Sequence, residues 1–259
     1  RSYARAPFLC LVTDPRLDVQ LNLAGHHEIV CPRAHFTLPY IVHDVAVNRL
    51  AHRAPPLSAR SIFAYMWAAK EVRMKTASKL RQRIMDEMRS DAACRLHEYD
   101  RHRDSPTFFD PAYPFVEDMT HSIFCPCPRG DTPTTRRFFS AALLGCIPVV
   151  VADHIALPFS DVIDYSQFSL QFAEEDVLAQ GLLPLLRNVS SATVAHLSTN
   201  LQSAGDLFKW PVEDDQELSC PLLDLLFHAL WRYSQSLHGS AARYLSQRCK
   251  YMADIPPLD

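Results

Sequence analysis

The stretch from residue 122 to residue 176 constrains the fold most, because its pattern predicts a strand, a turn, a helix and a second strand in direct succession. Residues 122–127 (SIFCPC) form an uncharged, largely apolar run, and residues 128–131 (PRGD) are typical of a turn. Residues 147–152 (IPVVVA) are an unbroken apolar run, as expected of a parallel strand covered on both faces. The pattern therefore predicts an α/β fold containing a βαβ unit with a right-handed crossover.

The helix of this unit has recognisable ends. Thr132 and Thr134 can both cap its start, and Pro133 suits a first helical position. Apolar residues follow at helical spacing, and Gly145 stands where a helix commonly ends in a left-handed residue. Because α/β units bind ligands at the carboxyl ends of their strands, we expect the functional site next to the start of this helix.

A basic turn lies at this expected site. Arg129 and Gly130 follow the first strand, and Arg136 and Arg137 are expected one turn into the helix. The start of the helix also offers free N–H groups and a positive dipole end, so the arrangement favours a diphosphate. The sequence has neither the glycine-rich dinucleotide motif nor a P-loop lysine, so an ordinary α/β domain with a basic turn is the alternative at this point.

Several blocks of this stretch, in a consistent order and at consistent gaps, carry a family resemblance. They are residues 124–130 (FCPCPRG), Arg137, residues 145–150 (GCIPVV), residues 157–164 (LPFSDVID) and Glu175-Asp176, matched to an acidic E-x-D motif. Together they resemble the exostosin-like glycosyltransferases of family 47, in the half of those proteins that binds the nucleotide sugar. Several ordered blocks are far more specific than any single motif.

The resemblance implies an α/β fold of the GT-B type, with two Rossmann-like halves that each hold a parallel sheet. Residues 1–115 would form the N-terminal, acceptor-side half, which is short or incomplete, and residues 116–259 would form the C-terminal half that binds the nucleotide sugar. The implied reaction moves a sugar from a nucleotide diphospho-sugar, linked to UDP, to a glycan hydroxyl. It needs no metal and no further cofactor, and the implied location is the Golgi lumen.

The resemblance also implies a donor site made of Arg129, Gly130, Thr134, Arg137, Ser140 and Glu175. Arg129, Arg137 and the helix start would stabilise the negative charge that grows on the departing diphosphate. Glu175 would face the donor, with a carboxylate that merely favours a helix N-terminus as the alternative.

The base that accepts the acceptor's proton would come from the N-terminal half, as is usual in enzymes with two facing domains. Asp44 is the residue we name for this role. His43 and Asp14 are the other candidates, and the sequence does not choose between them.

Two departures from the family pattern suggest a second, non-catalytic function. Ser140 stands where the family has a glutamate in the predicted helix, and Trp67 is followed by alanine where the family has a glycine near the cleft. Only six glycines occur in the whole chain, fewer than a doubly wound enzyme normally uses. A catalytically degenerate protein, acting as a structural or accessory subunit of a larger complex in an organelle, is therefore the alternative to the transferase.

The charge and hydropathy of the chain limit the classes of partner that it can bind. The formal net charge of −3 gives no general affinity for nucleic acid or anionic membranes. No run of about 18 apolar residues is present, so no membrane span is predicted. By resemblance, an anchor and a stem are expected before Arg1.

Eight cysteines occur without a CxxC pair, so the spacing of a zinc site is missing. Buried free thiols are the first interpretation, and disulfides are the main alternative because the family works in an oxidising lumen. Asn188-Val189-Ser190 is a glycosylation sequon, which is meaningful only in a secretory protein.

Helical periodicity also predicts helices outside the central unit, and two of them bear on the site. The first spans residues 76–97, with Arg81 at the place of a family arginine; a solvated basic face is the alternative for that residue. The second spans residues 177–186 and contains Gly181.

Overall fold

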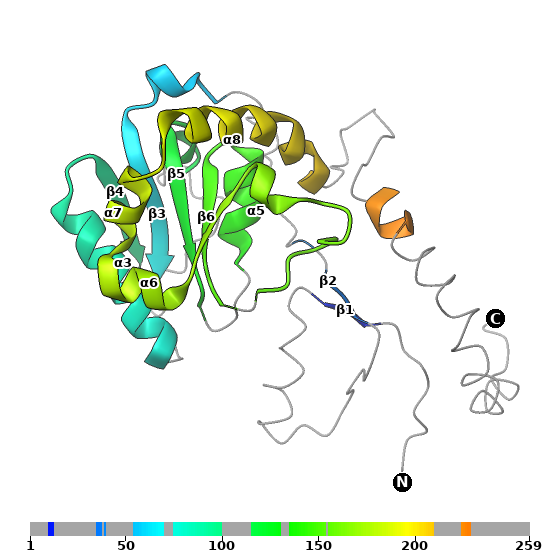
Figure 1. Cartoon of the computed structure of the whole chain (residues 1–259), viewed down its shortest axis with the longest axis horizontal. Helices are drawn as coiled ribbons and strands as arrows, with labels where there is room; N and C mark the ends of the chain where they lie inside the picture. Colours follow the sequence, from blue (N-terminus) through cyan, green and yellow to red (C-terminus); the bar gives the residue numbers. More distant parts are fainter. Residues whose placement is uncertain are drawn as a thin grey trace, which may run out of the picture.

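A five-stranded parallel sheet forms the centre of the structure, in the order β4-β3-β5-β6-β7 (Figure 1). The strands are β3 (Ile62–Ala69), β4 (Cys94–Tyr99), β5 (Ser122–Pro128), β6 (Ile147–Val151) and β7 (Leu170–Phe172). This computed structural model describes residues 10–12, 35–37, 39, 54–69, 75–99, 115–130, 135–153, 155–209 and 224–228, and every structural statement below concerns these residues. The predicted α/β class with a parallel sheet is confirmed.

Helices cover both faces of this sheet. They are α3 (Lys75–Ser90), α4 (Phe115–Thr120), α5 (Arg136–Leu143), α6 (Glu174–Gln180), α7 (Leu182–Arg187) and α8 (Ser191–Ala204), with 3₁₀ turns η1 (Leu57–Ala59), η2 (Tyr165–Gln167) and η3 (Gly205–Phe208) and a helical segment at 224–228. Helices α3, α6 and α7 lie together on one face, and α5 and α8 lie on the other (Figure 1). No helix within the described residues is long and apolar enough to cross a membrane.

The core is densest around β6, whose five residues are all buried, as the unbroken apolar run predicts. On the α5 side, Phe138 and Phe139 pack against Phe208, with ring centroids 6.3 and 5.4 Å away. All three side chains are almost fully buried, and each such burial contributes about 2–3 kcal/mol. This aromatic packing holds α5 in place and thereby fixes the start of the helix.

The predicted strand–helix–strand order around α5 is confirmed, but its cap is not the expected one. The N-cap is Thr135, whose side-chain oxygen accepts a hydrogen bond from the backbone N–H of Arg137 at 3.3 Å. Thr132 and Thr134, the expected caps, lie outside the described residues. Because the helix begins at Arg136, both arginines lie in its first turn rather than one turn further in.

Two predicted helices are shorter than the periodicity suggested. The helix predicted over 76–97 ends at Ser90, where an oxygen of the Asp91 carboxylate accepts the backbone N–H of Ala93 at 3.0 Å and turns the chain into β4. The helix predicted over 177–186 is two helices, because Gly181 has a φ of 89° and separates α6 from α7. A side chain at position 181 would also meet the carboxylate of Glu87.

The expected division between residues 115 and 116 stays a prediction, and strands on both sides of it share one sheet. β3 pairs with both β4 and β5, so residues 62–99 belong to the same sheet as β5, β6 and β7. Within the described residues, the central parallel sheet therefore begins in sequence with β3. A separate two-stranded parallel sheet is formed by β1 (Cys10–Val12) and β2 (His35–Thr37).

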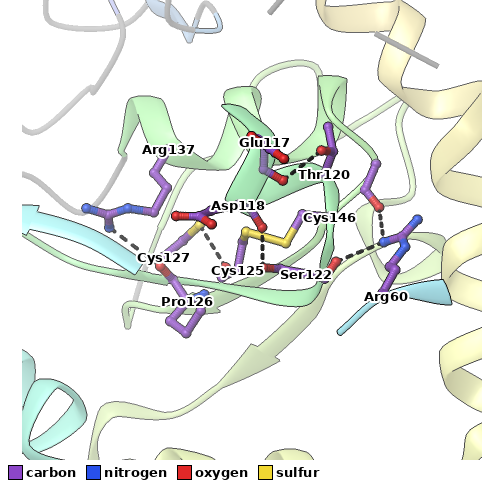
Figure 2. The surroundings of a disulfide bond; sticks show 11 residues. Arg60, Glu117, Asp118, Thr120, Ser122, Cys125, Pro126, Cys127, Arg137 and Cys146 are labelled. Carbon is purple, nitrogen blue, oxygen red and sulfur yellow. Dashed lines mark hydrogen bonds between the residues drawn. A yellow bond between two sulfur atoms is a disulfide. The ribbon is translucent and has the colours of Figure 1, made fainter. Parts of the chain in front are cut away.

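Two interactions hold the junction between α5 and β6 against β5, near the amino ends of the strands (Figure 2). Cys125 and Cys146 form a disulfide that joins β5 to the residue before β6. The guanidinium of Arg60 donates to the carbonyl oxygens of Ser122 at 3.0 Å and Gly145 at 2.6 Å. Gly145 has a φ of 74°, which confirms the predicted left-handed position after α5.

The cysteines thus divide between the two interpretations. The disulfide corrects the expectation of free thiols for Cys125 and Cys146, since their Cα atoms lie 5.9 Å apart, within bonding range. Cys127 and Cys94 are free thiols. Burial raises the pKa of the Cys127 thiol to about 12 and that of Cys94 to about 11, so both are inert at neutral pH.

Candidate active site

The strand order places a topological switch point between β3 and β5. The chain leaves β3 through α3 to reach β4 on one side, and it leaves β5 through α5 to reach β6 on the other. In open α/β sheets, ligands bind in the crevice outside the carboxyl ends of the strands at such a point. The residues that follow β3, β5, β6 and β7 at this edge are therefore the first to consider.

Arg129, directly after β5, is held in a small polar cluster. Its backbone N–H donates to the carbonyl oxygen of Val151 at 3.0 Å, and its side-chain Nη1 lies 3.4 Å from Oε1 of Glu174. The same oxygen of Glu174 accepts the backbone N–H of Asp153 at 3.0 Å, and Oδ1 of Asp153 accepts the N–H of Glu174 at 3.2 Å. Three parallel strands thus each contribute one member, which makes the cluster a rigid feature of the sheet edge.

Arg137 bridges the switch point itself. Its guanidinium donates to the carbonyl oxygen of Trp67 on β3 and, at 3.5 Å, to that of Pro126 on β5. Burial lowers the pKa of Arg137, although an arginine keeps its charge in any such environment. Within the described part of the chain, no carboxylate is paired with this guanidinium.

Two prolines explain why an arginine is needed there. Pro126 and Pro128 lack N–H groups, so β5 cannot donate to β3 at either position. The recorded register between the two strands ends at Ala64 and Phe124, although β3 continues to Ala69. Because the ladder is interrupted, Arg137 supplies the donors for the carbonyl groups at the open end of the crevice.

A second helix contributes an arginine that the sequence did not single out as a ligand. Arg81 of α3 is only 7% exposed, which rules out a solvated basic face for this residue. Its Nη2 donates to the carbonyl oxygen of Ala69, the last residue of β3, at 3.2 Å. A Cβ at Gly130 would lie 3.6 Å from Nη1 of Arg81, so the turn after β5 and this guanidinium are neighbours.

Ser140 does not reach toward the crevice. It lies one turn into α5, is 8% exposed, and its hydroxyl donates to the carbonyl oxygen of Arg136 at 3.4 Å. This bond stays within the helix. Of the predicted donor ligands, Ser140 is therefore the one that the local geometry supports least.

Of the remaining predicted residues, Glu175 lies near the site without contacting Arg129, and the others lie outside the described residues. Glu175 is exposed in the first turn of α6, and it is the preceding residue, Glu174, that meets Arg129. Thr134 and the three candidate bases, Asp44, His43 and Asp14, lie outside the described residues. Their roles stay predictions.

Sequence reasoning missed three residues of the site, Glu174, Asp153 and Arg81, and could have found one of them. The family's E-x-D spacing fits Glu174 and Asp176, with Glu175 between them, so counting that spacing would have selected Glu174. Asp153 matches the family aspartate that follows the apolar run at 147–152, but its contact with Glu174 could not be predicted because it depends on the approach of β7. Arg81 matched a family position, but only the packing of α3 on the sheet shows that it is buried.

An open hollow of about 430 Å³ lies beside the loop after β6, lined by residues of that loop and by Gln171 of β7. None of the arginines at the switch point lines it, so it is separate from the cluster around Arg129. Within the described ranges, no group of three or more His, Cys, Asp or Glu side chains could hold a metal ion.

Comparison with known proteins places the whole central unit in one family. The model of the exostosin GT47 domain matches residues 17–189, which is more than half of the chain and includes β3 to β7. A protein of Arabidopsis thaliana named probable glucuronoxylan glucuronosyltransferase is 28% identical over 227 residues, which cover 83% of this chain and 44% of that protein. The chain thus spans less than half the length of this relative.

A second relative matches over a shorter stretch with higher sequence identity. A protein of Arabidopsis thaliana named probable beta-1,4-xylosyltransferase is 46% identical over 63 residues, which cover 24% of this chain and 15% of that protein. Among solved structures, a variant of S. aureus TarM in complex with fondaparinux, alpha-GlcNAc-glycerol and UDP matches with a TM-score of 0.38 and 14% identity, covering 79% of this chain and 41% of that one.

Proposed function

Because this chain belongs to the exostosin GT47 family, we propose that it takes part in moving a sugar from a nucleotide diphospho-sugar, linked to UDP, to a glycan hydroxyl. The names of two of its relatives, a probable glucuronosyltransferase and a probable xylosyltransferase, support this class of reaction. They also make glucuronic acid and xylose the first donor sugars to test. The proposal includes the GT-B arrangement, in which the central sheet faces an N-terminal, acceptor-side half.

The observation that carries the proposal is the set of cations at the switch point. Arg81, Arg129 and Arg137 come from α3, the turn after β5 and α5, and all three lie at the carboxyl edge beside the start of α5. A diphosphate needs fixed positive charge and N–H donors, and this edge offers both. We therefore assign the diphosphate of the donor to this crevice, with Gly130 leaving room for its approach.

The chemistry follows from that placement. The bond between the sugar C1 and the diphosphate oxygen breaks, and the acceptor oxygen forms a new bond to C1. The leaving diphosphate gains negative charge in the transition state, and preorganised arginines stabilise it without reorganising. Asp44 is the proposed base for the acceptor proton, with His43 and Asp14 as the other candidates.

Glu174 has a defined part in this scheme. Its carboxylate balances the charge of Arg129 and fixes the position of that side chain against β6. The separation of 3.4 Å between Nη1 and Oε1 is long for a charged pair, so a dianionic diphosphate can compete for the same guanidinium. The proposed mechanism needs no metal ion and no cofactor beyond the donor.

The proposed location, the Golgi lumen, depends on the family alone. The non-catalytic alternative, a subunit of a larger assembly, is motivated by the burial of Ser140 and by Trp67, which stacks on Phe115 with ring centroids 5.0 Å apart. Retention of nucleotide binding separates the two functions.

The experiment is calorimetric titration of the full-length protein with UDP, with and without Mg²⁺, for the natural protein and for Arg129→Ala. We expect metal-independent binding, and at least tenfold weaker binding for the variant, because a charge-assisted hydrogen bond contributes about 1.5–3 kcal/mol. Arg89→Ala is the matched control, since Arg89 is an exposed arginine paired with Glu98 and Asp86 away from the crevice. A folded protein that binds no UDP at millimolar concentration would overturn the transferase proposal.

A further inference from the structure

Asn188 lies in an exposed turn between α7 and α8 and begins the only Asn-X-Ser/Thr sequon of the chain. Its backbone N–H closes α7 by donating to the carbonyl oxygens of Pro184 and Leu185, each at 3.2 Å. Its side-chain amide forms no hydrogen bond with any part of the chain that the structure describes. From this exposed and uncommitted amide we propose that Asn188 carries an N-linked oligosaccharide.

The position of this turn leaves room for a glycan. Arg187, the last residue of α7, pairs with Asp91, which lies between α3 and the start of β4. The guanidinium of Arg187 also lies 5.1 Å above the ring of Phe63, near the start of β3. The turn is therefore at the amino edge of the sheet, opposite the crevice with Arg129, and a glycan there does not block that crevice.

The interior of the protein indicates the compartment in which such a modification occurs. Cys125 and Cys146 are both fully buried and joined by a disulfide. Structural disulfides form and persist in oxidising compartments such as the secretory lumen, and they are rare in the cytosol. N-glycosylation takes place in that same lumen, so the disulfide and the exposed sequon agree without any reference to the reaction the protein catalyses.

The third residue of the sequon, Ser190, is also the N-cap of α8. The hydroxyl of Ser190 accepts the backbone N–H of Thr193 at 3.1 Å and lies 2.8 Å from the hydroxyl of that residue, as the N-cap of α8. A sequon requires a hydroxyl at this position. Because folding commits this hydroxyl to α8, the sequon is best presented to a transferase before the turn forms.

The modification is a group transfer from a lipid diphosphate-linked oligosaccharide. The amide nitrogen of Asn188 forms a bond to C1 of the first sugar, while the bond from C1 to the diphosphate oxygen breaks. The lipid diphosphate leaves with the bonding electron pair, and the amide nitrogen gives up one proton to the host cell's transferase.

The test uses the full-length natural protein expressed in a eukaryotic host, treated with peptide N-glycosidase and followed by gel mobility and peptide mass spectrometry. We expect a mobility shift on treatment and conversion of the modified asparagine to aspartate. Asn188→Gln should lose the shift completely. Ser190→Thr should keep it, because threonine preserves both the sequon and the capping hydroxyl, and Asn200→Gln, outside any sequon, should also keep it.

Two outcomes would overturn the site. One is an untreated natural protein without glycan in cells where a reporter glycoprotein is modified; the other is a shift that survives in Asn188→Gln. Neither outcome bears on UDP binding, so a failure here is distinct from a failure of the proposed function. UDP titration of Asn188→Gln should match the natural protein within twofold, since the turn and the crevice lie at opposite edges of the sheet.

Discussion

Arg60 and Arg137 fasten opposite ends of the same crossover, and both do so by donating to backbone carbonyl groups. Arg60, at the amino ends of the strands, binds the carbonyl oxygens of Pro55, Ser122 and Gly145. Arg137, at the carboxyl ends, binds those of Trp67 and Pro126. Burial lowers the pKa of both guanidinium groups, and neither has a carboxylate partner within the described residues.

The two ends differ in how completely the arginine is used. The end with Arg60 is closed: its three hydrogen bonds are 2.6–3.0 Å long, and the Cys125–Cys146 disulfide fastens the same junction (Figure 2). At the other end, the bond from Arg137 to Pro126 is 3.5 Å long, at the limit for a hydrogen bond. A guanidinium has five N–H donors, so Arg137 has donors beyond these two bonds. The same residue type is structural at the closed end, and at the open end we propose that it also binds a ligand.

The largest expected effect is on stability, from Arg60→Met. The change leaves three carbonyl groups without their donor, that of Ser122 buried and those of Pro55 and Gly145 half-buried. We expect the free energy of unfolding to fall by about 3 kcal/mol, since each unsatisfied group costs about 1–3 kcal/mol before water and relaxation compensate. Denaturant unfolding measures this, and UDP affinity of the folded variant should stay within twofold. A stable Arg60→Met protein with weakened UDP binding would contradict the purely structural role of Arg60.

The next effect is on the ligand, from the matched variant Arg137→Met. We expect UDP binding to weaken by about tenfold, because a charge-assisted donor is lost, while the free energy of unfolding falls by only about 1–2 kcal/mol. Calorimetric titration and denaturant unfolding, run beside Arg60→Met, give the two values. Unchanged UDP affinity would make Arg137 a purely structural bridge and leave Arg81 and Arg129 as the donor ligands.

The sequence could predict this crossover because its signals are local. Two apolar runs, a basic turn and Gly145 are read within about thirty residues, and each corresponds to an observed strand, turn or left-handed position. Residues 94–99 (CRLHEY) carry no such signal: the periodicity extends the preceding helix to residue 97, and only pairing with β3 makes this segment a strand. Pairing partners distant in sequence decide such short segments.

The candidate site was predictable only in part, for the same reason. Arg129 and Gly130 follow a strand that the sequence identifies, so their place at the carboxyl edge was expected. The burial of Arg81 depends on how α3 packs against the sheet, and Glu174 differs from the predicted Glu175 by a single position in the first turn of α6. Packing between elements, rather than composition, settles both.

The smallest effect compares Glu174→Gln with Glu175→Gln. Glutamine can still accept the N–H of Asp153, but it removes the negative charge 3.4 Å from Arg129, so Arg129 should bind a diphosphate more readily. We expect UDP to bind about threefold more tightly, in keeping with the ~0.5–1 kcal/mol of a partly exposed ion pair, and Glu175→Gln to leave the affinity unchanged.

A double-mutant cycle then decides how Glu174 acts. If it acts through Arg129, the gain from Glu174→Gln disappears in the Arg129→Ala background, because there is no guanidinium left to release. Calorimetric titration of the four proteins with UDP measures this coupling. Weaker binding by Glu174→Gln alone would instead mean that its carboxylate contacts the nucleotide directly. In that case the open end of the crossover would recognise the donor through an acidic side chain as well as through basic ones. The two ends would then differ in function more than a comparison of Arg60 with Arg137 shows.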